Sequence, residues 1–214
     1  MATPLKIITS TTRPGRSVER VLPWLVGRFE ADDRFDVEVL DLRDWKLPLF
    51  QETYETVGDP TDPTYSDPIV RAWNRKVAEG GAFLFVTAEY NHSVPGELKN
   101  AIDNVFVSAA FRNKPAAFVG YSAGPIGGAR AVEHLAHVLI EAEAAALRNT
   151  VLIGNVGAAF DDAGQPTNVA TEAALRVMKD DLAWWAEGLA KARADGELLP
   201  GNARFMQELA ALAS

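Results

Sequence analysis

The sequence contains no cysteine. This absence excludes disulfide bonds, cysteine-bound iron–sulfur clusters, thiolate metal sites and a thiol nucleophile. Positive charge is also scarce, because 21 lysines and arginines stand against 29 aspartates and glutamates, for a formal net charge of −8. So acidic a chain is a poor candidate for binding nucleic acid or anionic membranes. We therefore expect neither of them as a partner.

Long apolar runs are missing as well. No apolar stretch approaches the ~20 residues that a membrane-spanning helix needs. The first residues, Met1-Ala2-Thr3-Pro4, lack the charged and apolar regions of a signal peptide. We therefore expect a cytoplasmic protein. Hydrophobic residues make up 48% and charged residues 23% of the 214 residues, a balance that predicts one globular domain over residues 1–214.

Five short apolar segments predict strands, and a helix or a crossover follows each of them. The predicted strands are residues 5–10, 35–40, 82–87, 115–121 and 150–154, and the predicted helices are residues 18–29, 69–79, a segment from Pro95, 129–147, 168–194 and 203–212. This alternation predicts an α/β fold, a parallel sheet with helices on both faces. The second strand alternates apolar and acidic residues, so it belongs at an edge of the sheet. That placement fits the strand order 2-1-3-4-5, in which ligands bind beside strands one and three.

A polar loop follows the first strand and leads into a helix. It contains Ser10, Thr11, Thr12, Arg13, Arg16 and Ser17. Hydroxyl groups, guanidinium groups and the N–H groups of a helix start together bind a phosphate monoester. The loop is neither G-x-G-x-x-G nor a Walker A loop, which disfavours a dinucleotide fold and an NTPase. A solvated turn with a serine helix cap remains the alternative.

Two further loops end strands at the same predicted edge. The loop after strand three offers carbonyls, amides and an aromatic ring from Glu89, Tyr90 and Asn91. The loop after strand four begins Ser122-Ala123-Gly124, and its small residues let a flat ligand approach the backbone closely. A phosphate site beside a slot lined by backbone predicts a mononucleotide with a planar ring.

Three segments carry a resemblance to a known family. S-T-T-R-P-G-R-S (residues 10–17), E-Y-N-H-S-V-P-G-E-L-K-N-A-I-D (residues 89–103) and the Ser/Gly-rich loop after strand four resemble the NADPH-dependent FMN reductases. This family belongs to the flavodoxin-like superfamily and has relatives described as quinone, azo-dye and chromate reductases. The resemblance covers about residues 5–190 and implies a flavodoxin-like three-layer sandwich with a five-stranded parallel sheet. One position departs from the family: Ala88 stands where a proline usually precedes Glu-Tyr-Asn, so the loop loses a fixed φ angle.

The resemblance also implies the cofactor site. The FMN phosphate would be held by Ser10, Thr12, Arg13, Arg16, Ser17 and the Val18 amide. The isoalloxazine ring would be lined by Glu89, Tyr90, Asn91 and His92, largely through backbone groups, and its pyrimidine edge would meet Ser122, Ala123 and Gly124. No metal site is expected.

The implied activity is transfer of a hydride from NADPH or NADH to FMN, followed by two-electron reduction of a quinone, free flavin or similar acceptor in a ping-pong scheme. Family members are commonly dimers or tetramers with the flavin near the subunit interface. The helix from Pro95 and a long irregular excursion over residues 43–68 are therefore candidate interface elements.

Alternatives remain for several of these assignments. His92 is the candidate for contacting nicotinamide or acceptor, and a structural loop histidine is its alternative. A flavodoxin-type electron carrier without NADPH turnover is the alternative function. Residues 120–124 match the G-x-S-x-G pattern of serine hydrolases around Ser122. The only later histidines, His134 and His137, follow too closely for a triad in chain order, and no second set of metal ligands accompanies them.

Overall fold

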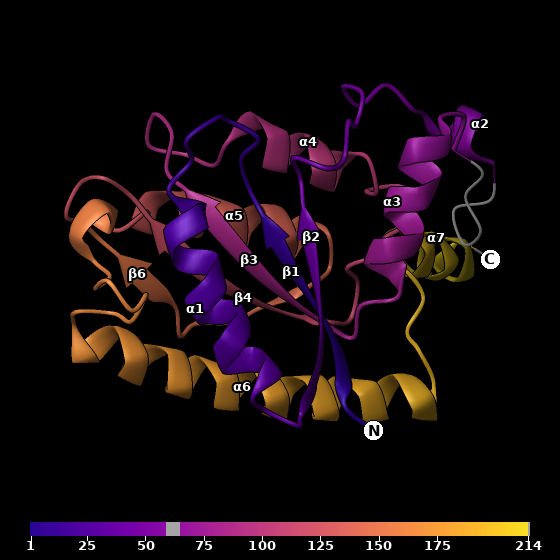
Figure 1. Cartoon of the computed structure of the whole chain (residues 1–214). Coiled ribbons are helices and arrows are strands. Elements are labelled where there is room, and N and C mark those ends of the chain that lie inside the picture. Colours follow the sequence, from indigo (N-terminus) through magenta and orange to yellow (C-terminus); the bar gives the residue numbers. More distant parts are fainter. Residues whose placement is uncertain (59–64, 214) are drawn as a thin grey trace.

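The computed structural model describes residues 1–58 and 65–213 and has a parallel β-sheet at its centre (Figure 1). The strands are β1 (Thr3–Thr9), β2 (Phe35–Asp41), β3 (Ala82–Ala88), β4 (Pro115–Tyr121), β5 (Ala145–Ala146) and β6 (Val151–Ile153). They lie in the order β2-β1-β3-β4-β5, with β6 also paired to β4, and every pairing between these strands is parallel. The predicted order 2-1-3-4-5 is confirmed.

Burial along the strands explains this order. Every residue of β3 and of β4 is buried, as expected for central strands covered on both faces. In β2, Asp36 is exposed and the residues at positions 37–39 are half-buried. Strand β2 therefore lies at the sheet edge, where its alternating apolar and acidic pattern predicts it.

Helices cover both faces of the sheet. Apolar side chains of α1 (Val18–Glu30) and α6 (Val169–Asp195) pack on one face, and those of α3 (Pro68–Ala78), α4 (Gly96–Asp103) and α5 (Ala129–Glu141) pack on the other. The shorter elements are α2 (Tyr54–Val57), the 3₁₀ helix η1 (Val156–Ala158) and the C-terminal α7 (Gly201–Leu212). The predicted three-layer, flavodoxin-like architecture is confirmed. Within the described residues, no helix combines the length and the apolar character needed to cross a membrane.

The helix predicted over residues 129–147 is too long. It ends at Glu141, because Glu143 adopts a φ of 55° and the N–H of Ala144 donates to the carbonyl of Leu139 at 2.9 Å. A left-handed residue with such a backward hydrogen bond closes a helix. The alanine-rich run hides this end, since alanine favours a helix in any sequence window.

The fifth position of the sheet also differs from the prediction. Two short strands, β5 and β6, occupy it in place of one, so the sheet has six strands rather than five. Strand β5 pairs with the start of β4, and β6 pairs with the end of β4. The final strand therefore still delivers its loop to the same edge as β4.

The predicted irregular excursion over residues 43–68 lies partly outside the described residues, which omit 59–64. Its first part is fastened to α4. The side chains of Asn100 and Asn104 donate to the carbonyl of Pro48 at 2.8 and 3.0 Å, and the Phe50 N–H donates to Asn100 at 2.8 Å. The two segments predicted as interface elements therefore contact each other.

Candidate functional site

The carboxyl ends of β1, β3 and β4 bring three loops together at one edge of the sheet. These are the first loop (residues 10–17), the second loop (88–94) and the third loop (122–128). The first and second loops contact directly, because the hydroxyls of Thr11 and Tyr90 lie 3.0 Å apart and the N–H of Ala88 donates to Ser10 Oγ at 3.0 Å. The third loop is held by the Ser122 N–H, which donates to the carbonyl of Ile153 at 3.1 Å.

The first loop ends at the start of α1. Ser17 occupies the cap position without a side-chain hydrogen bond to the helix, and Val18 is the first helical residue. The N–H groups of the first turn are therefore not capped by this side chain, and they carry the positive end of the helix dipole. Gly15 has a φ of 66° and open space beside its α-carbon. An anion can approach the backbone of this loop closely.

The two arginines of the first loop have different surroundings. Arg16 is buried, and its guanidinium donates to Asp41, Glu19 and the carbonyl of Thr11. The bidentate pair with Asp41 joins the first loop to the end of β2. Burial raises the pKa of the Asp41 carboxyl, but hydrogen bonds from Arg16, the Arg43 backbone and Thr9 outweigh it and lower that pKa to about 2. Arg16 is thus largely engaged by the protein itself.

Arg13 is exposed and forms no ion pair with any residue that the structure describes. Its guanidinium carbon lies 5.4 Å from the centre of the Tyr90 ring, within the range of a cation–π contact. This contact holds the positive charge over the junction of the first and second loops. Of the two arginines, Arg13 is the one available to a ligand.

Thr12 faces an acidic side chain. Its hydroxyl lies 3.2 Å from Glu97 Oε1, and its N–H lies 3.5 Å from the same oxygen. Glu97 belongs to the first turn of α4, so this contact joins the first loop to the helix that follows the second loop. Glu97 is not among the site residues predicted from the sequence.

The second loop contains a tight turn at its tip. Tyr90 and Ser93 exchange backbone hydrogen bonds of 2.9 and 3.0 Å, and the two residues between them, Asn91 and His92, have φ angles of 50° and 67°. Positive φ at both central positions is the pattern of a type I′ turn, in which asparagine is favoured. The side chains of Asn91 and His92 are exposed at this tip. His134 of α5 supports the turn, with its Nδ1 2.9 Å from Ser93 Oγ.

Glu89 directs its carboxylate away from the turn. Oε1 accepts from Arg130 Nε at 2.6 Å, and Oε2 is buried without a hydrogen-bond partner among the described residues. The ion pair fastens the second loop to the first turn of α5. Glu89 therefore offers its backbone rather than its carboxylate to the loop edge. Arg130 follows Gly127-Gly128 at the same edge of the sheet. Its place directly after the third loop was the sequence signal that could have identified Arg130 as a site residue.

Close backbone packing shapes the third loop. A Cβ at Gly120 would lie 2.7 Å from the carbonyl oxygen of Gly127, and a Cβ at Gly154 would lie 2.3 Å from that of Pro125. Side chains cannot enter these contacts. The hydroxyl of Ser122 donates to the carbonyl of Gly124 at 2.9 Å, and no histidine hydrogen-bonds to it in the described part of the chain. The arrangement does not support the hydrolase reading of residues 120–124.

Tyr121 ends β4 directly before the third loop, and its hydroxyl is buried. Burial is the main cause that raises the pKa of the Tyr121 hydroxyl, and the nearby Tyr90 raises it further. Ser10, Arg16 and Arg13 act in the opposite direction. Although Ser10 is near enough to affect this pKa, the Tyr121 hydroxyl has no partner with hydrogen-bond geometry among the described residues. A buried hydroxyl without a partner close to the first loop is a position where a ligand oxygen would be stabilising.

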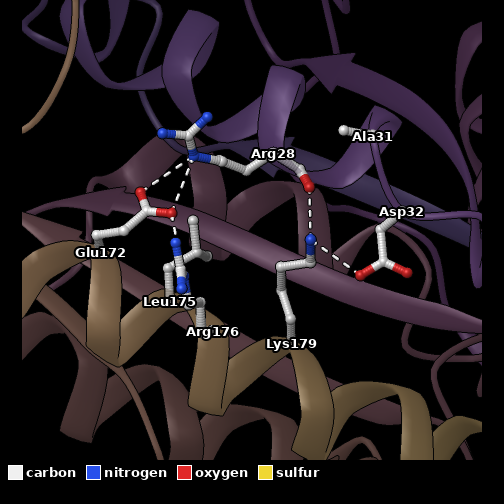
Figure 2. A pocket seen from close by; sticks show the side chains of 7 residues that line it. All are labelled: Arg28, Ala31, Asp32, Glu172, Leu175, Arg176 and Lys179. Atoms are coloured by element: carbon white, nitrogen blue, oxygen red, sulfur yellow. Dashed lines mark hydrogen bonds and ion pairs between the residues drawn. The ribbon is translucent and has the colours of Figure 1, made fainter.

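A charged crevice of about 320 Å³ lies elsewhere, between α1 and α6 (Figure 2). Figure 2 shows Arg28 facing Glu172, and Lys179 facing Asp32, with N–O distances of 3.0 and 2.9 Å. Arg176 also pairs with Glu172, at 3.5 Å. Because its cations pair with its own acids, this crevice joins two helices that cover one face of the sheet and offers no unpaired charge to a ligand.

The fold is that of a flavodoxin-like protein, and its three loops at the carboxyl edge of the sheet include one whose donors suit an anion. A family model described as NADPH-dependent FMN reductase matches residues 5–158. The chain belongs to the NADPH-dependent FMN reductase family. The resemblance stated above is thereby confirmed. The description of this family names FMN and NADPH, which agrees with the cofactor, the co-substrate and the enzyme class that the resemblance implies.

Characterised relatives agree with this membership. A Pseudomonas putida quinone reductase is 32% identical over 179 residues, which cover 80% of this chain and 87% of that protein. NAD(P)H-dependent FMN reductases of Schizosaccharomyces pombe and Pseudomonas aeruginosa are 31% and 37% identical, over 62% and 56% of this chain. These last two matches span only 63% and 62% of the length of those relatives.

Solved structures show the same fold. A flavoenzyme NAD(P)H:(acceptor) oxidoreductase from Paracoccus denitrificans superposes with a TM-score of 0.68 at 24% identity, covering 87% of this chain and 98% of that one. An archaeal flavodoxin gives a TM-score of 0.53 at 13% identity, covering 86% of this chain and 99% of that one. Identities this low support the architecture alone.

The residues at the loop edge fit FMN. The uncapped start of α1, the open backbone at Gly15 and the available charge of Arg13 suit a phosphate group. The buried hydroxyl of Tyr121 lacks a partner beside them. The structure brings all three predicted loops to one edge, and it adds Glu97, Tyr121, Arg130 and His134, which the sequence analysis did not assign to the cofactor site. Individual contacts to FMN stay predictions.

Proposed function

We propose that this protein is an FMN-containing oxidoreductase that uses NADPH or NADH to reduce a quinone, a free flavin or a similar small acceptor. The observation that carries the proposal is the junction of the first and second loops. The Thr11–Tyr90 and Ser10–Ala88 hydrogen bonds fix a phosphate-binding loop beside a loop rich in backbone polar groups. A mononucleotide with a planar ring needs a phosphate-binding loop and a loop of backbone polar groups next to each other.

Each of the three loops contacts a different part of FMN. In the first loop, Ser10, Thr12, Arg13, Ser17 and the Val18 amide hold the phosphate, while Arg16 keeps the loop in shape through Asp41. In the second loop, the backbone from Glu89 to His92 lines the ring, and the Ser93–His134 hydrogen bond supports it. In the third loop, Ser122, Ala123 and Gly124 meet the pyrimidine edge.

FMN, when bound, supplies the redox chemistry, because it accepts a hydride from the nicotinamide and passes two electrons to the acceptor. The protein binds and orients the partners and leaves one ring face accessible to both in turn, which gives ping-pong kinetics. Backbone N–H groups of the third loop would lie at the pyrimidine edge of bound FMN and would favour negative charge there. His92 lies at the exposed tip of the second loop and contacts nicotinamide or acceptor. A homodimer or homotetramer and a cytoplasmic location complete the proposal.

An absorbance spectrum and a turnover assay test this function. The purified protein should show the absorbance bands of bound flavin and should oxidise NADPH steadily with a quinone or free FMN as acceptor. Plots of reciprocal rate against reciprocal NADPH concentration should be parallel at several acceptor concentrations. Bound FMN without turnover would favour a flavodoxin-type electron carrier. Absence of bound flavin and of flavin binding would refute the proposal.

A further inference from the structure

Glu97 holds a negative charge beside the donors of the first loop. Its Oε1 lies 3.2 Å from the Thr12 hydroxyl and 3.5 Å from the Thr12 N–H. A carboxylate in the first turn of α4 is stabilised by the positive end of that helix. The Glu97 carboxylate therefore has a favourable position close to a loop whose chemistry suits an anion.

The other acids near the loops are neutralised, and Glu97 is not. Asp41 pairs with Arg16, and Glu89 pairs with Arg130. Among residues 1–58 and 65–213, no lysine, arginine or histidine forms an ion pair with Glu97. Its charge therefore acts on whatever anion the first loop binds.

A phosphate on the first loop would need the same Thr12 donors. It must compete with the Glu97 carboxylate for them, and it then lies close to an unpaired charge of its own sign, which is repulsive. We propose that Glu97 is a cofactor-release residue, a positioning residue that lowers the affinity of the first loop for the FMN phosphate and so lets FMN exchange. This inference rests on the proposed function.

The variant Glu97→Gln tests it, because the amide keeps the shape and an acceptor oxygen but removes the charge. Glu141→Gln is the matched control. It makes the same change in net charge on an exposed residue at the C-terminal end of α5, whereas the three loops lie at the N-terminal end of that helix. FMN and riboflavin are titrated into flavin-free full-length protein, with flavin fluorescence as the readout. Riboflavin has the ring but no phosphate, so it separates the two ends of the cofactor.

We expect Glu97→Gln to bind FMN about three- to tenfold more tightly at low salt and riboflavin with unchanged affinity. The gain should shrink near ~0.5 M NaCl, since salt screens partly exposed charges. Glu141→Gln should leave both affinities unchanged. An FMN affinity that is unchanged or weaker in Glu97→Gln overturns the inference, as does an equal gain for riboflavin. If the wild-type protein binds neither flavin, the proposed function itself fails.

Discussion

Replacing Arg16 with methionine should destabilise the protein and weaken FMN binding through the loss of structure in the first loop. Methionine keeps the length of the side chain and removes the guanidinium. The change removes the guanidinium from the Asp41 carboxylate, which keeps only its hydrogen bonds from Thr9 and the Arg43 N–H, and it leaves the Thr11 carbonyl without its guanidinium donor. Since both groups lie where the first loop meets β2, the loop loses its anchor rather than a direct contact to phosphate.

The magnitude follows from the Asp41 carboxyl. A pKa lowered from 3.8 to about 2 corresponds to roughly 2.4 kcal/mol in favour of the charged form. The Asp41 side chain is 18% exposed, and Arg43 and Thr9 share in lowering its pKa, so the part lost with Arg16 is about 1.5 kcal/mol. The unpaired Thr11 carbonyl adds about 1 kcal/mol. We expect a loss of about 2.5 kcal/mol at pH 7, or roughly 5–10 °C in Tm for a chain of this length.

Urea unfolding as a function of pH measures this effect. The folded-state pKa of Asp41 is depressed, so its contribution is present above about pH 4 and is lost as the pH falls towards 2. The difference in free energy of unfolding between wild type and Arg16→Met should therefore shrink over that interval. A variant of unchanged stability that loses FMN but keeps riboflavin would refute the reasoning and make Arg16 a direct phosphate ligand.

Three further predictions use the same assays. Arg13→Ala should weaken FMN binding about tenfold while leaving riboflavin affinity and stability unchanged, because its charge-assisted contact is to phosphate; equal losses for both flavins would contradict this. Ala88→Pro should lower stability by about 1 kcal/mol in urea unfolding, since Ser10 Oγ loses the Ala88 N–H donor, and Ala88→Gly serves as the control that keeps the N–H. Gly154→Ala should lower Tm and flavin affinity together, because the new methyl group would lie 2.3 Å from the Pro125 carbonyl oxygen and must displace the third loop; an unchanged Tm would argue against that close contact.

The sequence predicted the architecture well where burial alone determines it. The apolar runs that become β3 and β4 are buried along their whole length. Such continuous apolar runs identify both strands and their positions in the sequence. Local patterns failed where a single residue decides the outcome. The positive φ of Glu143 ends α5. The helix propensities of the preceding residues do not predict that backbone conformation.

The site was predictable only in part, for a related reason. Strand ends and loop composition placed the three loops at one edge, but ion pairs between distant residues decide which side chains remain available there. Arg16 and Asp41 are 25 positions apart, and Glu89 and Arg130 are 41 apart. Sequence spacing gives no information about such pairs. Both arginines of the first loop therefore looked equivalent, although only Arg13 is left without an ionic partner among the described residues.

Ala88 shows how a departure from the family pattern is accommodated. Proline would fix φ at this position but would have no N–H. Alanine gives up that restraint and instead donates a hydrogen bond to Ser10 Oγ from a fully buried backbone. Because Ser10 directly follows β1 and Ala88 ends β3, this bond joins the carboxyl ends of two neighbouring strands. In this chain, order at the start of the second loop therefore comes from a contact with the first loop.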